Sequence, residues 1–157
     1  MTPSIDPQTS NGLISRLYGQ AITSLDEAHE ALRDEALRLR DEYFQAAKAR
    51  ADGKIIYRLI DVRGNGKGSV SIAWCKVYFF NGEGGKKKHA RSPIAKGLSH
   101  SYAASTVTFG METWFVELFH LYEPKLAIIR EQLLNLGKVR KQLLMQQRKV
   151  NANPPVA

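Results

Sequence analysis

The sequence predicts an α+β fold with a long N-terminal helix, a three-stranded antiparallel β-meander, and a C-terminal helix or helix pair. Apolar residues recur at intervals of three and four in the first third of the chain, and β-branched and aromatic runs between glycine-rich turns fill the middle. Helical spacing returns in the last third. With 157 residues and 43% hydrophobic content, the chain has the length and composition of one globular domain. We expect that domain over residues 13–150, with helical extensions, between a flexible arm at 1–12 and a tail at 151–157.

The N-terminal helix is predicted over residues 24–51, although the helical pattern itself starts at Leu13. Ser24 and Glu27 have the spacing of a capping box, which would satisfy the first amides of a helix. Gly53 is suited to end it. One apolar stripe follows the helix through Leu25, Ala28, Leu32, Ala36, Leu39, Tyr43 and Ala47.

The three strands are predicted at residues 54–62, 69–80 and 86–94, joined by glycine-containing turns. Pro93 indicates that the third strand is an edge strand or ends there, because proline cannot donate to a sheet ladder. We expect Trp74 to be buried between the sheet and the helices. Tyr78 is the better candidate for an exposed ring that stacks on bases.

The C-terminal region predicts a helix with one apolar face formed by Val107, Met111, Trp114, Phe115, Leu118 and Tyr122. Pro124 should break or kink this helix, or start the next one. Leu126, Ile129, Leu133 and Leu136 then have the spacing of a coiled-coil seam, which Arg140 and Gln147 interrupt. Such a seam would pair helices within the chain or across a homodimer.

The sequence lacks the side-chain clusters that common enzyme sites need. His29, His89, His100 and His120 are scattered with no metal-ligand spacing, and the one cysteine, Cys75, lies among strand residues. The glycine loops have no phosphate-loop spacing, and carboxylates after Gly53 are sparse. We therefore expect a non-enzyme with no metal or cofactor. Without a signal-peptide pattern or an apolar run of roughly 18 residues, we expect a cytoplasmic protein without a membrane segment.

Charge is unevenly distributed along the chain. Residues 1–53 hold six basic and nine acidic side chains, residues 54–110 hold ten and two, and residues 111–157 hold seven and four. A positive central region of this kind favours a nucleic-acid partner. The nucleic-acid-binding residues predicted in it are Arg58, Arg63, Lys67, Lys76, Tyr78, Lys86, Lys87, Lys88, Arg91 and Lys96. A second basic group, at residues 138–149, could follow a duplex, meet an acidic partner, or be an ordinary solvated helix face.

The order of several short motifs resembles the MobI family of auxiliary mobilisation proteins. These motifs are Ile72-Ala-Trp74-Cys-Lys76, Pro93-Ile-Ala-Lys96-Gly97, the pair Glu112 and Trp114, and Glu123-Pro-Lys-Leu-Ala-Ile-Ile129-Arg130. The resemblance covers roughly residues 35–145. It implies a DNA-processing accessory factor that a relaxase needs in order to nick the transfer origin of a conjugative element, and that does not itself cut DNA.

Two other functions remain open on the residues alone. The first is a protein–protein adaptor or inhibitor that uses the basic surface, and its sign would be a sizeable exposed apolar patch. The second is an RNA-binding module, because charge does not separate RNA from DNA.

Overall fold

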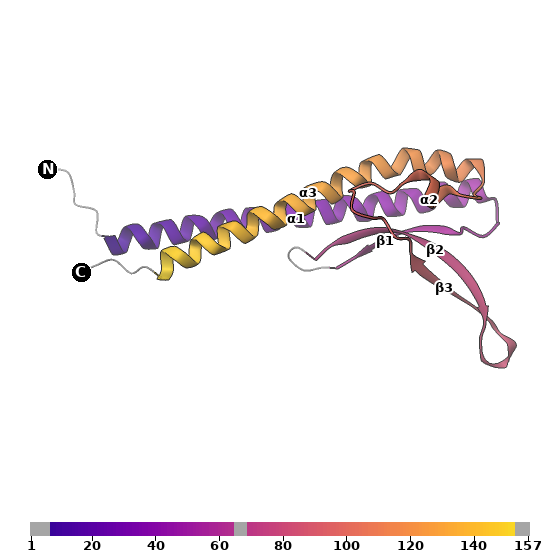
Figure 1. Cartoon of the computed structure of the whole chain (residues 1–157), viewed down its shortest axis with the longest axis horizontal. Coiled ribbons are helices and arrows are strands. Elements are labelled where there is room, and N and C mark those ends of the chain that lie inside the picture. The colour runs from indigo at the N-terminus through magenta and orange to yellow at the C-terminus, as the bar shows by residue number, and fades with distance from the viewer. Residues whose placement is uncertain (1–6, 65–68, 153–157) are drawn as a thin grey trace.

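The computed structural model describes residues 7–64 and 69–152. Two long helices, α1 (Pro7–Ala51) and α3 (Thr113–Ala152), run side by side in opposite directions, as Figure 1 shows. Between them in sequence come β1 (Arg58–Arg63), β2 (Ser71–Asn81), the short 3₁₀ turn η1 (Glu83–Gly85), β3 (Lys87–Pro93) and the short helix α2 (Ala104–Thr108). The strands form one antiparallel sheet in the order β1-β2-β3. The predicted α+β meander is confirmed.

Helix α1 is longer than the sequence predicted. It begins at Pro7, so the expected arm at 1–12 is wrong for residues 7–12, and residues 1–6 lie outside the described part. The predicted start at Ser24 is also wrong, since Ser24 and Glu27 lie inside the helix. Proline is well suited to a first helical turn because the amide it lacks would have no partner there. The end is as expected, with Gly53 in the left-handed region at φ 80°.

The core lies where the sheet packs on the C-terminal half of α1 and the N-terminal half of α3. Trp74 is fully buried, as predicted, and its ring meets Tyr43 edge-on at a centroid distance of 5.1 Å. Phe115 and Phe119 close the cluster at 5.8 and 5.4 Å from the same indole. The contacts of Tyr43 and Phe115 with the indole are edge-to-face, and such contacts add to the stability gained by burying apolar area. The cluster therefore fixes the position of β2 against both helices.

Helix α3 does not break at Pro124, which lies inside it. Proline removes the amide that would bond the carbonyl of His120. Because His120 lies on the exposed side of α3, water can take the place of that lost partner. The helical segments are instead interrupted earlier, between α2 and α3, where Gly110 adopts a φ of 71°.

Beyond the sheet, the two helices continue together as a stalk, formed by residues 7–25 of α1 and 132–152 of α3 (Figure 1). Two polar side chains of α3 interrupt its seam. Arg140 Nε donates to Asp26 Oδ1 at 2.7 Å, and Gln147 Nε2 donates to the Ser15 carbonyl at 3.0 Å. The seam that the sequence indicated thus pairs helices within one chain. No helix in the described residues is long and apolar enough to cross a membrane.

Candidate nucleic-acid interface

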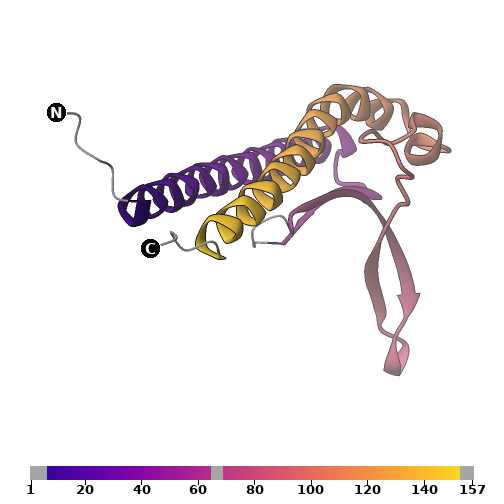
Figure 2. The same cartoon turned by 60° about the vertical axis from the view of Figure 1, so that its left-hand side comes forward.

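The β2–β3 hairpin extends beyond the rest of the sheet and forms an arm, defined here as residues 76–91. The ladder between β1 and β2 ends at the Arg58–Lys76 pair, whereas the ladder between β2 and β3 continues to Asn81–Lys87. In Figures 1 and 2 the arm projects away from both long helices. It is therefore a two-stranded ribbon with solvent on both faces.

The aromatic side chains of the arm confirm that it lies outside the core. Burial along β2 ends at Val77, and the next three residues, Tyr78, Phe79 and Phe80, are 46%, 46% and 45% exposed. Side chains alternate between the two faces of a strand, so a segment that packs on one side would leave only every second ring exposed. Three consecutive exposed rings instead place aromatic surface on both faces.

Basic side chains accompany the rings on each face. Directly opposite residues of an antiparallel pair share a face, so the pairs Tyr78–Ala90 and Phe80–Lys88 lie on one side together with Lys76. The pairs Phe79–His89, Asn81–Lys87 and Val77–Arg91 lie on the other side. Both faces of the arm consequently present rings beside cations.

The tip of the arm brings lysines close to a glycine turn. Gly84 and Gly85 adopt φ values of 73° and 72°, which other residues rarely tolerate. A Cβ at Gly82 would lie 2.6 Å from Lys88 Cε, so glycine leaves room for the lysine stem to cross the turn. Lys86, Lys87 and Lys88 are exposed there. The turn thus holds three cations at the end of the ribbon.

Arg58, predicted to bind nucleic acid, is instead a structural residue. It is 7% exposed, and its Nε donates to the Val107 carbonyl at 3.0 Å. Its own carbonyl accepts a hydrogen bond from Tyr43 Oη at 2.7 Å. The prediction was wrong because Arg58 falls on the face of β1 that packs against the helices, beside buried Ile60. Burial lowers the pKa of this guanidinium from its ordinary value.

Two further predicted cations share one carboxylate. Arg63 pairs with Asp61 through Nε, and Arg91 Nη2 lies 3.8 Å from the other oxygen of Asp61. The bond to Asp61 raises the pKa of Arg63. Both guanidinium groups remain about half exposed. Because Asp61 offsets part of their charge, they contribute less net charge to a partner than two unpaired arginines would.

The remaining predicted residues separate into two groups. Lys76, Tyr78, Lys86, Lys87 and Lys88 belong to the arm and are exposed. Lys96 is half-buried and donates to the Ser99 carbonyl, away from the arm, and Lys67 lies outside the described residues. The sequence favoured Tyr78 as the exposed ring, and the structure leaves Phe79 and Phe80 exposed to the same extent. The signal for this was in the sequence: the apolar run at residues 69–80 is longer than the one at 54–62, so β2 had to extend beyond β1.

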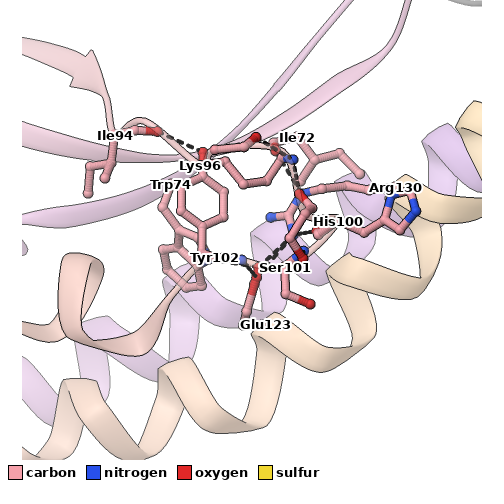
Figure 3. Close-up of polar contacts among 11 residues, drawn as sticks. Ile72, Trp74, Ile94, Lys96, His100, Ser101, Tyr102, Glu123 and Arg130 are labelled. Carbon is pink, nitrogen blue, oxygen red and sulfur yellow. Dashed lines mark hydrogen bonds and ion pairs between the residues drawn. The ribbon is translucent and has the colours of Figure 1, made fainter.

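Behind the arm, a buried polar network joins β2, the loop before α2, and α3 (Figure 3). Arg130 Nη1 donates to Glu123 Oε1 at 2.7 Å, and Arg130 Nε donates to the Ile72 carbonyl at 2.9 Å. Glu123 also accepts from Trp74 Nε1 at 3.2 Å and from the Tyr102 amide at 3.2 Å. Nearly every polar side-chain atom of Arg130 and Glu123 has a hydrogen-bond partner, as a buried ion pair requires.

The exception within the described residues is Arg130 Nη2, which has no hydrogen-bond partner. The guanidinium instead lies over the Tyr102 ring, with Cζ 4.9 Å from its centroid. A cation held over an aromatic face recovers part of the interaction that a missing acceptor would supply. Burial is also the main cause of the raised pKa of Tyr102.

Among the described residues, no three histidine, cysteine or carboxylate side chains gather closely enough to hold a metal ion. Cys75 is buried, and burial raises the pKa of its thiol. His89 and His120 are exposed and lie on different elements.

Comparison with protein families supplies the assignment. The family model of the MobI protein matches residues 32–144. The chain belongs to the MobI family. The match covers the whole sheet, the arm, the buried network, the C-terminal part of α1 from residue 32, and α3 up to residue 144. No curated protein and no solved structure matches the chain.

The residues that resemble MobI are mainly structural in this member of the family. Trp74 from one motif meets Glu123 and Arg130 from another in the buried network. Trp114 Nε1 donates to Glu112, so the two residues of another motif are also partners. The resemblance therefore rests mainly on the scaffold, from which the exposed arm projects (Figure 1). A mobilisation-related accessory role follows from the family.

Proposed function

We propose that this MobI protein is a non-catalytic DNA-binding accessory factor of conjugative transfer, which acts at the transfer origin together with a relaxase. The observation that carries the proposal is the arm, with exposed lysines at its tip and exposed rings on both faces. Its family supports the mobilisation role. The arm supports DNA as the partner.

A two-stranded antiparallel ribbon fits the major groove of B-form DNA. In that position, Lys76 and Lys88 on one face and Lys87 on the other would meet the phosphates of opposite groove walls. Phosphate contacts of this kind position a protein on DNA and carry little sequence information. The rings offer apolar contact to thymine methyl groups or sugars, and on unpaired DNA they would stack on bases.

The first experiment measures binding of the whole chain to labelled duplex and single-stranded DNA by fluorescence anisotropy, across salt from low to physiological. We expect affinity to fall steeply with the logarithm of salt concentration, with a slope of about −0.9 per phosphate contact on duplex DNA. A transfer-origin duplex should bind more tightly than a scrambled one. Absence of binding at low salt would overturn the proposal. Single-stranded RNA in the same titration tests the RNA alternative.

The arm is tested by charge reversal in the variant K86E/K87E/K88E. Because these side chains are exposed, the free energy of unfolding should change by less than about 0.5 kcal/mol, while the salt slope should fall by about 2.7 in magnitude. The matched control is K48E/K125E/K149E, which changes the net charge equally on α1 and α3. Equal affinity of the two folded variants would exclude the arm from the site.

The relaxase partnership has its own assay, in which a cognate relaxase nicks a supercoiled plasmid that carries the transfer origin. We expect the MobI protein to increase the nicked fraction and to produce no nick without the relaxase. Nicking by the MobI protein alone would contradict the non-catalytic role.

A protein-binding adaptor is the second candidate, and one cluster favours it. Tyr57 and Phe79 are exposed and meet edge-on at 6.4 Å, beside a cavity of about 540 Å³ lined by Phe44, Ile56 and Val77 among others. Exposed apolar surface of this kind is typical of protein interaction sites. A Phe79→Ala variant that keeps its DNA affinity but loses stimulation of nicking would assign this face to a protein.

A further inference from the structure

The stalk has an unusual charge distribution that the arm does not explain. Residues 7–25 of α1 and 132–152 of α3 contain no Asp or Glu, while they contain Arg16, Lys138, Arg140, Lys141, Arg148 and Lys149. The acidic side chains of α1 all lie closer to the sheet, from Asp26 onward. Arg140 is paired with that aspartate, which leaves the other cations without a carboxylate on the stalk.

Three of these cations follow one stripe of α3. Leu134, Lys138, Lys141, Met145 and Arg148 recur at intervals of four and three, so their side chains lie on the same face of the helix. We call this face the basic stripe. Lys138, Lys141 and Arg148 also line one shallow surface depression together with Met145, which confirms that they are neighbours.

The basic stripe faces the side of the helices on which the sheet lies. Leu134, its first member, lines a cavity of about 280 Å³ together with Val70, Ser71 and Ile72 of the sheet region. The rest of the stripe continues in the same direction, past the end of the sheet. Figures 1 and 2 both show the arm projecting from the helices on this side. The stripe and the arm therefore border the same side of the molecule, at its two ends.

We propose that a single DNA duplex contacts both the arm and the basic stripe, so that the stalk is a second backbone-binding surface. This inference rests on the proposed DNA binding of the arm. Lys138 to Arg148 spans about 15 Å at the rise of an α-helix. Duplex DNA presents many phosphates over that length, at one charge per ~1.7 Å of axis. The lack of carboxylates on the stalk removes the repulsion that such a backbone would otherwise meet.

The test compares two double variants in the whole chain. K138Q/K141Q removes two charges from the stripe, and K48Q/K125Q removes two charges from exposed lysines of α1 and α3 that lie outside the stalk. On a 30-base-pair duplex chosen for the assay, the stripe variant should lose about 1.8 units of salt slope and at least about 10-fold in affinity at low salt. The control should match the wild type.

Hydroxyl-radical footprinting on that duplex locates the lost contact. The wild-type protein should protect two separated groups of sugars, and K138Q/K141Q should keep the group that belongs to the arm and lose the other. Identical slopes and footprints for the two double variants, with DNA binding still dependent on the arm lysines, would overturn this inference alone. Absence of DNA binding by the wild type would overturn the proposed function instead. If K138Q/K141Q binds DNA normally but fails to stimulate nicking, the stripe binds a protein and the inference is wrong.

Discussion

The two halves of the α1–α3 helix pair are stabilised in different ways. Near the sheet, the helices enclose the rings of Tyr43, Trp74 and Phe115, none of which has exposed surface. All the acidic residues of α1 lie in this half. In the stalk, polar contacts from Arg140 and Gln147 interrupt the seam, and carboxylates are absent from both helices.

This difference separates a half that is stabilised by a buried core from a half whose surface charge is unbalanced. Burial of large rings stabilises the half near the sheet. On its surface, acidic side chains of α1 offset the basic ones. The stalk buries less apolar surface and keeps an excess of one charge, which costs stability through self-repulsion. A surface of that kind is informative because folding alone gives no reason for it.

The largest expected effect is in the buried network near the sheet. Arg130→Ala removes the partner of Glu123 and leaves a buried carboxylate facing Trp74 and the Tyr102 amide. We expect a loss of about 3–5 kcal/mol in the free energy of unfolding, measured by urea denaturation followed by circular dichroism. A loss below about 1 kcal/mol would show that water reaches Glu123 and that this half is less tightly closed than its burial indicates.

A smaller effect is expected for Tyr43→Phe, which removes the hydrogen bond to the Arg58 carbonyl. Leaving that buried acceptor without a donor should cost about 1–3 kcal/mol at neutral pH. Burial raises the pKa of Tyr43, so the unfolded chain releases this proton first as the pH rises above about 10. Wild-type stability should therefore fall with pH in that range, because the folded state retains more protons.

The matched measurement is the urea midpoint of both proteins from pH 8 to pH 11, values chosen for the assay. Tyr43→Phe should lose stability less steeply at the alkaline end. A residual fall is expected in both proteins, since burial also raises the pKa of Cys75 and Tyr102. Parallel curves for the two proteins would mean that Tyr43 has the same pKa in the folded and the unfolded chain, as a solvated tyrosine would.

The smallest effect is expected in the stalk. The side chains of Arg140 and Asp26 are 23% and 18% exposed, so solvent screens their pairing in part. Asp26→Ala should cost about 1 kcal/mol or less in global stability. In native-state amide exchange, stalk amides should exchange faster than those of residues 36–47 in the wild type, and the variant should widen that difference. Equal protection along α1 would remove the distinction between the halves.

Several parts of the candidate interface could be predicted from the sequence, and others could not. The lysines of the arm tip and Tyr78 were identified because strand and turn patterns are local and lysine rarely becomes buried. Arg58 was misassigned because its burial depends on α2, which places the Val107 carbonyl within reach. Arg63 and Arg91 come from different strands, and only the register of the sheet brings both to Asp61.

The sequence by itself determined the order of elements, the edge position of β3 and the burial of Trp74, because each depends on periodicity or on a residue type with narrow preferences. It also determined the segregation of charge. Tertiary structure alone decided that α1 begins at Pro7 and that α3 runs through Pro124, since packing between the two helices outweighs weak local signals. It also decided that the polar residues of the α3 seam would meet Asp26 and Ser15, because such pairings depend on how distant segments align.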